Sequence, residues 1–262
     1  MTFEEFRAFI DEAIAVTTPI IMRHYGDPAL DVETKADATP VTLADRGAEE
    51  ALRKLINERF PDHGIIGEEF GAENTGAEFL WVLDPVDGTK AFATACPLFG
   101  TLIALQRRET PIYGAIHHPA LGQLIVGDGA TTLLNGRPVR TRPTSRIEEA
   151  TFLTTSWTSP ARYQSAAGFD ALSQKVRLAR TWGDCFGYTQ VAAGWADIAA
   201  DPIVNPWDLA ALIPIIRGAG GVITDWQGRD PVGADSAVAC ATPQLHEAVI
   251  TTLNDAGCPP AR

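Results

Sequence analysis

Two aspartates and a glycine-threonine step follow a strongly apolar segment in the run WVLDPVDGTK, which begins at Trp81. Asp84 and Asp87 are three residues apart, and Gly88 and Thr89 come directly after them. Acids beside proline are common in loops. An apolar strand that ends in two carboxylates and a glycine turn is, however, typical of a site that holds a metal ion and a phosphate group. The run therefore predicts metal-assisted phosphate chemistry.

Two further acids stand at the edges of apolar segments elsewhere in the chain. Glu68 follows the residues GIIG, and Asp208 lies in the segment PWDLAA that begins at Pro206. Mg²⁺ prefers oxygen ligands in octahedral geometry and keeps some of its waters, so carboxylates are its expected ligands. With Asp84 and Asp87 these acids can hold two ions about 3.5–4 Å apart. Taken singly, a glutamate can be a solvated surface residue, and an acid at a helix start can complement the helix dipole.

Gly88 and Thr89 suit the phosphate half of this chemistry. Glycine lets the backbone turn tightly, and free amides at the start of a short helix, predicted from Thr89 to about Ala95, can bind phosphate. Thr89 also offers a hydroxyl that can orient a water molecule. We expect one ion to activate the attacking water and a second to neutralise the leaving ester oxygen.

These segments resemble the inositol monophosphatase superfamily, the Mg²⁺-dependent, lithium-sensitive phosphatases. The resemblance covers nearly the whole chain, beginning at Lys35 and closing with GAGG at Gly221. Between these points it includes TPVTLAD from Thr39 to Asp45, the acidic segments above, and the pair Trp207-Asp208. The resemblance implies an α/β (α+β layered) fold with alternating αβαβα layers, two to three Mg²⁺ ions per subunit, and a homodimer.

Carried over position by position, the resemblance assigns metal ligands and catalytic groups. The implied ligands are Glu68, Asp84, the Val86 carbonyl, Asp87 and Asp208. Asp45 and Thr89 would form the pair that, together with Glu68, orients and deprotonates the water. Without the resemblance, Asp45 is equally an acid at a helix start, since Thr42 and Asp45 have the spacing of a capping box.

Several segments are similar to the histidinol-phosphate phosphatase branch of the superfamily, which makes histidinol in the late steps of histidine synthesis. They are DGTKAF, PLFGTLIAL, WGDCFGY and ALIPII. Asp184, in WGDCFGY, stands where an inositol-preferring member more often has a small residue, and its carboxylate can pair with the ammonium or imidazole of histidinol phosphate. Asp201 falls where the family places a substrate-contacting acid. We therefore expect Gly88, Thr89, Asp184 and Asp201 to bind substrate; a helix cap and a strand-end acid are the alternative roles of the two aspartates.

Three other functions stay open at this point. An inositol-1-monophosphatase or a broad sugar-phosphate phosphatase would use the same metal site, and only the surroundings of Asp184 and Asp201 argue against it. A 3′,5′-bisphosphate nucleotidase shares the Asp-Gly-Thr-Lys step. Some members of the superfamily bind transcription machinery, so a non-catalytic interaction protein is the third alternative, which the intact set of acids disfavours.

Composition is that of a globular enzyme: the 262 residues are 45% hydrophobic, enough for one substantial core or two packed halves. The net charge of −12 argues against nucleic acid and anionic membrane partners and suits a small phosphate ester held through cations. We expect a cytoplasmic chain, because it has no leader-like start and no apolar run of about 18 residues. The four cysteines are scattered, without zinc or disulfide spacing.

The elements that must position the acids follow from the hydrophobic periodicity. Apolar residues at helical spacing predict helices near the N-terminus and from about Leu43 to Phe60, followed by strands at 64–67 and 79–83. Antiparallel strands are expected from Phe99 to Val139, with turns at glycines. A polar stretch then separates an N-terminal α+β half, residues 1–140, from a C-terminal α/β half, residues 141–262. The second half alternates strands and helices and includes one helix predicted over 206–217.

Overall fold

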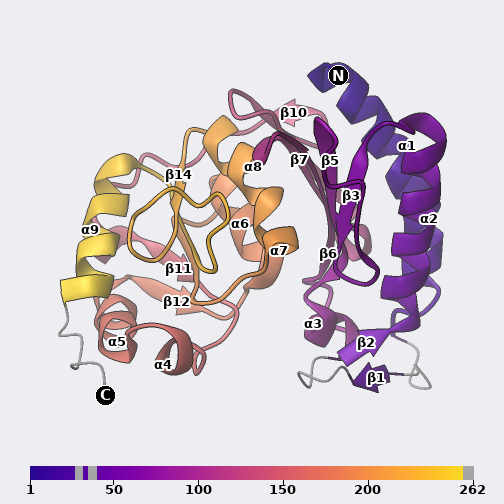
Figure 1. Ribbon diagram of the computed structural model, residues 1–262. Coiled ribbons are helices and arrows are strands. Elements are labelled where there is room, and N and C mark those ends of the chain that lie inside the picture. The colour runs from indigo at the N-terminus through magenta and orange to yellow at the C-terminus, as the bar shows by residue number, and fades with distance from the viewer. Residues whose placement is uncertain (27–31, 35–39, 256–262) are drawn as a thin grey trace.

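The computed structural model describes residues 1–26, 32–34 and 40–255 of the chain (Figure 1). The first residues of the family motif, Lys35 and Thr39 among them, lie outside the described residues. A short two-stranded sheet, β1 (Val32–Thr34) and β2 (Pro40–Thr42), lies immediately before the second helix. Within the described residues, no helix is both long and apolar enough to span a bilayer.

An eight-stranded sheet forms the centre of the N-terminal half, in the order β10-β9-β8-β7-β6-β5-β3-β4. Among the described strands of this sheet only β3 and β5 pair in parallel, and the antiparallel strands expected between Phe99 and Val139 are confirmed. Its strands are β3 (Gly64–Gly67), β4 (Gly71–Glu73), β5 (Phe79–Asp87), β6 (Gly100–Arg107), β7 (Thr110–His118), β8 (Gln123–Gly127), β9 (Thr132–Leu134) and β10 (Arg137–Pro138). A 3₁₀ turn at Pro119–Leu121 joins β7 to β8.

Helices α1 (Phe3–Met22) and α2 (Leu43–Arg59) cover one face of this sheet. Helix α1 begins with a capping box, in which the Glu5 N–H donates to the Thr2 hydroxyl (3.2 Å) and the Thr2 N–H to the Glu5 carboxylate (2.7 Å). The buried residues between these helices and the sheet are Phe6, Phe9, Ile10, Ala13, Leu52, Ile56, Ile65, Trp81, Leu83, Ile103, Leu105, Ala115 and Val126. This layer fixes the position of α2 over β3 and β5.

The opposite face of the sheet packs on α6 (Asp184–Ala192), α7 (Pro206–Ala210) and α8 (Leu212–Gly218). Here α8 approaches so closely that a Cβ on Gly114 would lie 2.2 Å from the Ala211 carbonyl oxygen. The single helix predicted over 206–217 is wrong, since the helix is interrupted at Ala211. Pro214 explains the interruption, because proline has no N–H to donate to the carbonyl four residues earlier.

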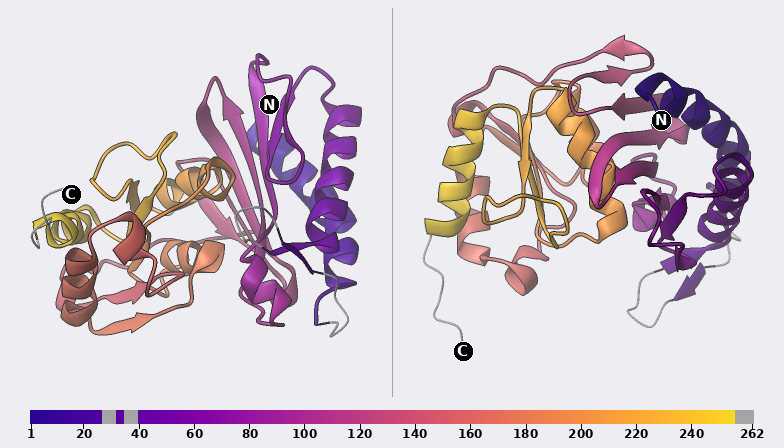
Figure 2. Two further views of the ribbon diagram at one scale, coloured as in Figure 1. Left: turned by 60° about the horizontal axis from the view of Figure 1, so that its bottom comes forward. Right: turned by 45° about the horizontal axis from the view of Figure 1, so that its top comes forward.

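A five-stranded mixed sheet forms the centre of the C-terminal half, in the order β12-β11-β13-β15-β14. Its strands are β11 (Thr151–Leu153), β12 (Leu178–Arg180), β13 (Ile198–Asp201), β14 (Val222–Thr224) and β15 (Ala237–Cys240). Helices α5 (Ala166–Lys175) and α9 (Pro243–Asp255) lie on its outer side, with α4 (Pro160–Tyr163) before α5 and a 3₁₀ turn at Ile147–Glu149 before β11. The helices α6 and α8 lie between the two sheets (Figure 2).

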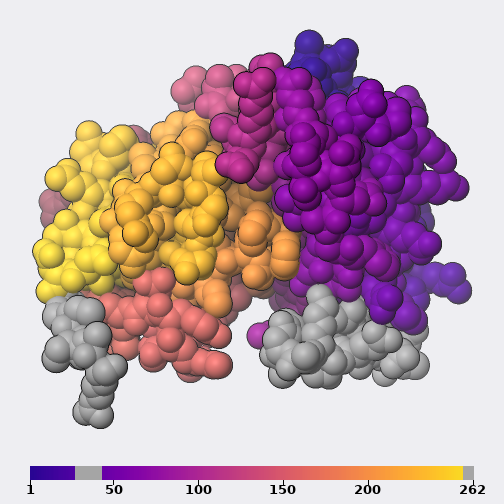
Figure 3. All heavy atoms as spheres, in the orientation of Figure 1, coloured from indigo at the N-terminus to yellow at the C-terminus, as the bar shows by residue number. Residues whose placement is uncertain are grey.

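The expected αβαβα layering is therefore confirmed: α1 and α2, the large sheet, α6 to α8, the small sheet, and finally α5 and α9 (Figure 2). In the space-filling view the indigo-to-magenta and orange-to-yellow parts of the chain are two adjoining blocks (Figure 3). One buried cluster nevertheless draws on both, with Val82 and Leu102 from the large sheet and Leu153 and Ala199 from the small one. The division into halves at residue 140 stays a prediction.

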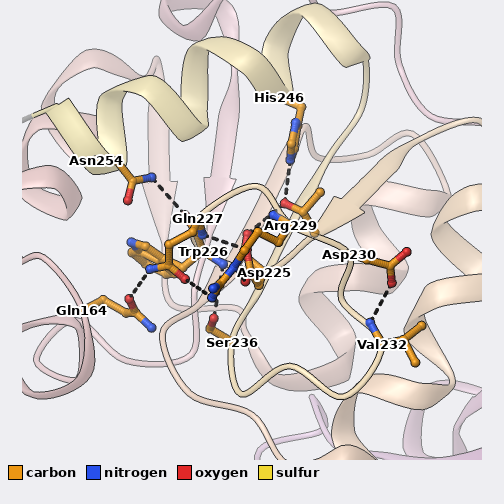
Figure 4. Close-up of polar contacts among 11 residues, drawn as sticks. Gln164, Asp225, Trp226, Gln227, Arg229, Asp230, Val232, Ser236, His246 and Asn254 are labelled. Atoms are coloured by element: carbon orange, nitrogen blue, oxygen red, sulfur yellow. Dashed lines mark hydrogen bonds and ion pairs between the residues drawn. The ribbon is translucent and has the colours of Figure 1, made fainter. Parts of the chain in front are cut away.

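The segment between β14 and β15 is held by its own side chains and by α9 (Figure 4). The Asp225 carboxylate accepts the N–H groups of Gln227 (2.9 Å) and Arg229 (2.7 Å) and pairs with the Arg229 guanidinium (2.6 Å). From α9, the Asn254 amide donates to the Trp226 carbonyl at 3.0 Å. These contacts join the last helix to the small sheet.

Candidate active site

Asp84 and Asp87, the two aspartates of the WVLDPVDGTK run, both lie within strand β5. The strand was predicted to end at Leu83, but it runs to Asp87 with an irregularity in its pairing between Asp84 and Asp87. Such a bulge bends a strand and redirects its side chains. The Asp84 carboxylate is buried and accepts the Val86 N–H at 3.1 Å, which holds the bent segment. The bulge therefore sets the positions of both aspartates on one rigid element.

Asp208 reaches the same place from α7. A carboxylate oxygen of Asp84, of Asp87 and of Asp208 all lie within 4.8 Å of one another. At the start of α7 the Asn205 N–H donates to Asp208 at 2.7 Å, so this acid caps its helix and faces the cluster at once. The α6 helix contributes the Cys185 N–H, which donates to Asp87. The two halves of the chain thus meet at the three carboxylates.

Burial and the closeness of other acids change the pKa values of the three clustered carboxylates. Burial, followed by the charges of Glu68, Asp87, Asp208 and Asp45, raises the pKa of Asp84 well above its ordinary range. Burial and the neighbouring acids raise the pKa of Asp87 as well, and burial raises the pKa of Asp208. Carboxylates placed in this way repel one another unless a proton or a cation lies between them.

Glu68 and Asp45 belong to two further elements near the cluster, the turn after β3 and the helix α2. Glu68 follows β3, and its N–H donates to the Leu83 carbonyl on β5 at 3.2 Å. Asp45 is buried in the first turn of α2. Glu68 lies outside the tight group of three carboxylates. Among the neighbouring charges, however, that of Glu68 has the largest effect on the pKa of Asp84. Both acids thus lie near enough to Asp84 for their charges to raise its pKa.

Gly88 and Thr89 form the turn from β5 into α3 (Thr89–Ala93). Gly88 has φ +81°, a conformation that favours glycine. The Thr89 hydroxyl donates to the Val86 carbonyl at 3.1 Å, so the carbonyl expected to bind metal contacts the expected catalytic hydroxyl. The helix is shorter than the predicted one, which reached Ala95, because the chain turns at Ala95 with φ +57°.

Asp184 lies opposite this turn, at the start of α6. Its φ is +49°, and its N–H donates to the Thr155 hydroxyl at 2.7 Å. A Cβ placed on Gly88 would lie 3.0 Å from the Asp184 Oδ2, so the carboxylate is in contact with the glycine turn. Burial and the charge of Asp201 raise the pKa of Asp184 to about 7.

Asp201 ends β13 behind Asp184. Its carboxylate is buried, accepts the Thr155 N–H at 2.8 Å and the Tyr188 hydroxyl at 3.0 Å, and has its pKa raised by burial. Thr155 therefore contacts both acids, through its hydroxyl and through its N–H. Asp87, Asp184, Asp201 and Asp208 line one pocket of about 210 Å³.

Several residues of this site were not among those predicted from the sequence. Lys90, Thr155, Ser156, Ser159 and Tyr188 also line the pocket. Tyr188 follows Asp184 by one helical turn, which was an available signal. The serines and Thr155 lie in a polar loop without any pattern of their own, so only the folded chain brings them to the pocket.

Fold and site together define the class: a layered α/β protein in which carboxylates from β5 and α7 converge. The model of the inositol monophosphatase family matches residues 3–257. A histidinol-phosphatase from Chlorobaculum parvum is 39% identical over 237 residues, covering 90% of this chain and 92% of that protein. One from Mycobacterium tuberculosis is 38% identical over 236 residues, covering 88% and 90%. The chain belongs to the inositol monophosphatase family and is a phosphatase, as the sequence predicted.

A solved structure agrees with this assignment. The inositol monophosphatase from Zymomonas mobilis superposes with a TM-score of 0.85 at 33% identity, covering 97% of this chain and 99% of that one. The similarity extends across both sheets, because nearly all of each chain is covered. The family assignment therefore applies to the whole chain and includes the elements that carry Asp84, Asp87 and Asp208.

Proposed function

We propose that the protein is a Mg²⁺-dependent histidinol-phosphate phosphatase, which converts L-histidinol phosphate and water into L-histidinol and phosphate. The observation that carries the proposal is the Asp184 carboxylate, which lies against Gly88 with Asp201 behind it. These two acids are additional to the three that converge at β5 and α7. A pocket with this excess of negative charge suits an ester whose alcohol part is cationic. The relatives named histidinol-phosphatase support the same substrate.

The donor set fits magnesium. Asp84, Asp87 and Asp208 offer only carboxylate oxygens, and their pKa values are raised by burial first and by neighbouring acids second, both of which a divalent cation would offset. We propose that these three acids, Glu68 and the Val86 carbonyl hold two to three Mg²⁺ ions per subunit. When bound, the ions supply positive charge that offsets the phosphate oxygens and the oxygen of the departing alcohol.

The remaining residues position the water and the phosphate. Because the Thr89 hydroxyl gives its proton to the Val86 carbonyl, its oxygen is able to accept a hydrogen bond from water. Asp45 and Glu68, whose charges both raise the pKa of Asp84, would take the proton of that water. The water then attacks phosphorus in line with the ester oxygen. As in other phosphoryl transfers, the protein acts chiefly by placing charge.

The alcohol part of the substrate would lie toward α6 and β13. Asp184 is half-buried, its backbone N–H donates to the Thr155 hydroxyl, and its carboxylate lies against Gly88, where an ammonium group would pair with it. Each Asp201 oxygen accepts one hydrogen bond in the folded chain, which leaves a lone pair on each for the substrate. We propose that Asp184 is the principal contact and Asp201 the supporting one.

The test is phosphate release from purified protein with L-histidinol phosphate, inositol 1-phosphate and adenosine 3′,5′-bisphosphate in parallel, with Mg²⁺ and with EDTA. A strong Mg²⁺-dependent preference for L-histidinol phosphate would support both the metal and the substrate. Preference for another ester would keep the metal site and refute the role of Asp184. Absence of activity on all three would favour an interaction protein, in which case binding to a partner would be insensitive to mutation of Asp87.

A further inference from the structure

Glu49 is a buried acid on α2, one helical turn after Asp45 and on the same face. Its side chain is 0% exposed. The Glu49 Oε2 accepts the Glu69 N–H at 2.8 Å, and Oε1 accepts the Phe70 N–H at 3.2 Å and the Arg53 Nε–H at 2.8 Å. Three donors therefore converge on one carboxylate that touches none of the clustered aspartates.

Two of these donors belong to the turn that carries Glu68. The Glu68 N–H donates to the Leu83 carbonyl at 3.2 Å, next to Asp84 on β5. The next two N–H groups, of residues 69 and 70, both donate to the Glu49 carboxylate. Three consecutive amides are thus held, one by the strand of the metal site and two by α2. This arrangement leaves the Glu68 backbone little freedom to turn away from Asp84.

The contact between Glu49 and the turn is also a steric one. A Cβ on Gly67 would lie 2.0 Å from the Glu49 Oε1, so the carboxylate packs directly on the glycine backbone. At the other end of the turn the Arg53 guanidinium, which pairs with Glu49, donates to the Gly71 carbonyl. Glu49 and Arg53 together hold both ends of the turn from β3 to β4.

We propose that Glu49 is a positioning residue for metal binding: it holds the turn at residues 67–71 so that Glu68 faces Asp84. This inference rests on the Mg²⁺ site proposed above. A residue that fixes a ligand without touching the ion typically changes metal affinity about 10- to 100-fold when it is mutated. Glu49 is expected to act in this way, because its loss would free the amides of the residues that follow Glu68.

The experiment is calorimetric titration of Mg²⁺ into the full-length wild-type protein and into Glu49→Gln. Glutamine keeps the size of the side chain but puts an NH₂ group where an oxygen now meets N–H donors. Asp197→Asn is the matched control, since Asp197 is also 0% exposed, accepts the Thr151 N–H at 2.7 Å and pairs with Arg142 at 3.3 Å, but lies directly before β13 of the small sheet. We expect Glu49→Gln to bind Mg²⁺ at least about tenfold more weakly and Asp197→Asn to bind it as the wild type does.

Activity gives a second measurement on the same proteins. Glu49→Gln should need about tenfold more Mg²⁺ for half-maximal rate and recover most of its kcat at saturating Mg²⁺, a pattern that a general loss of stability does not produce. Gly67→Ala displaces the same carboxylate from the turn side and should weaken Mg²⁺ binding in the same direction.

The outcomes separate the two proposals. A folded Glu49→Gln or Gly67→Ala protein with wild-type Mg²⁺ affinity overturns the role of Glu49, as does an equal loss in Asp197→Asn. Thermal unfolding of each variant shows whether it is folded. A folded protein with either Glu49→Gln or Gly67→Ala is enough to test the role of Glu49. A wild-type protein that binds no Mg²⁺ refutes the metal site itself, whereas wild-type binding with unaffected variants refutes only the positioning role.

Discussion

Replacing Asp184 by asparagine is the sharpest test of the proposed substrate. The backbone of Asp184 is held by the Thr155 hydroxyl, which accepts the Asp184 N–H at 2.7 Å, and the side chain packs on Gly88. Asparagine fits the same space, so the substitution removes the charge and little else. A hydrogen bond between charged groups contributes about 1.5–3 kcal/mol. Because about 1.36 kcal/mol corresponds to a factor of ten, kcat/KM for L-histidinol phosphate should fall about 10- to 100-fold, mainly through KM.

The assay is phosphate release at saturating Mg²⁺ near pH 8, because the pKa of Asp184, raised by burial and by Asp201, is about 7. For glycerol 2-phosphate, an ester without a cationic group, kcat/KM should change by no more than about twofold. Asp170→Asn, an exposed acid on α5, is the control with the same change of net charge. Equal losses on both esters, or no loss on either, would refute recognition of a cation by Asp184.

Three further predictions concern the acidic cluster and the turn beside it. Asp87→Asn should lower kcat at least about 10²- to 10³-fold with an unchanged circular dichroism spectrum, and a near-normal kcat would contradict its role. An acid whose pKa is raised in the folded state stabilises the protein fully when the pH is below its ordinary pKa, 3.8 for aspartate. In EDTA this contribution is lost as the pH rises through the folded-state pKa, which is about 7 for Asp184. The Tm in EDTA should therefore fall from about pH 5 to about pH 7.5, and the rise in Tm on adding Mg²⁺ should grow over the same range; a flat Tm would count against a strained cluster. Gly88→Ala should lower the free energy of unfolding by about 1–2 kcal/mol, because the φ of residue 88 is +81° and the new Cβ would lie 3.0 Å from Asp184. An unchanged urea midpoint would show that this turn tolerates a side chain.

Periodic segments were predicted well because their burial follows directly from local spacing. Helix α2, expected over about 43–60, spans Leu43–Arg59, and β3 has the expected bounds of Gly64–Gly67. Each buries one continuous apolar face or run, which the sequence displays without any long-range information. The interruption near Ala211 was missed, although Pro214 lay in the sequence, because the apolar pattern continues without a break on both sides of it.

The extent of β5 was missed for a different reason. The sequence places a proline and two aspartates after Leu83, and these residue types ordinarily end a strand. In the folded chain Thr101 on β6 donates to the Pro85 carbonyl at 2.7 Å, and the pairing resumes at Asp87 opposite Gly100. The neighbouring strand therefore prolongs β5 through residues that alone would favour a loop.

The sequence by itself determined the chemistry of this protein: which acids are present, that they stand at the edges of apolar elements, and which family the chain belongs to. Residue type and spacing carry this information, because Mg²⁺ prefers oxygen ligands and glycine allows the backbone to turn tightly beside a ligand. Only the tertiary structure decided which groups meet. Asp208 joins Asp84 across more than a hundred residues, and Glu49 reaches the turn beside Glu68 from another element. Such contacts depend on the packing of two sheets and three helix layers, which no local pattern encodes.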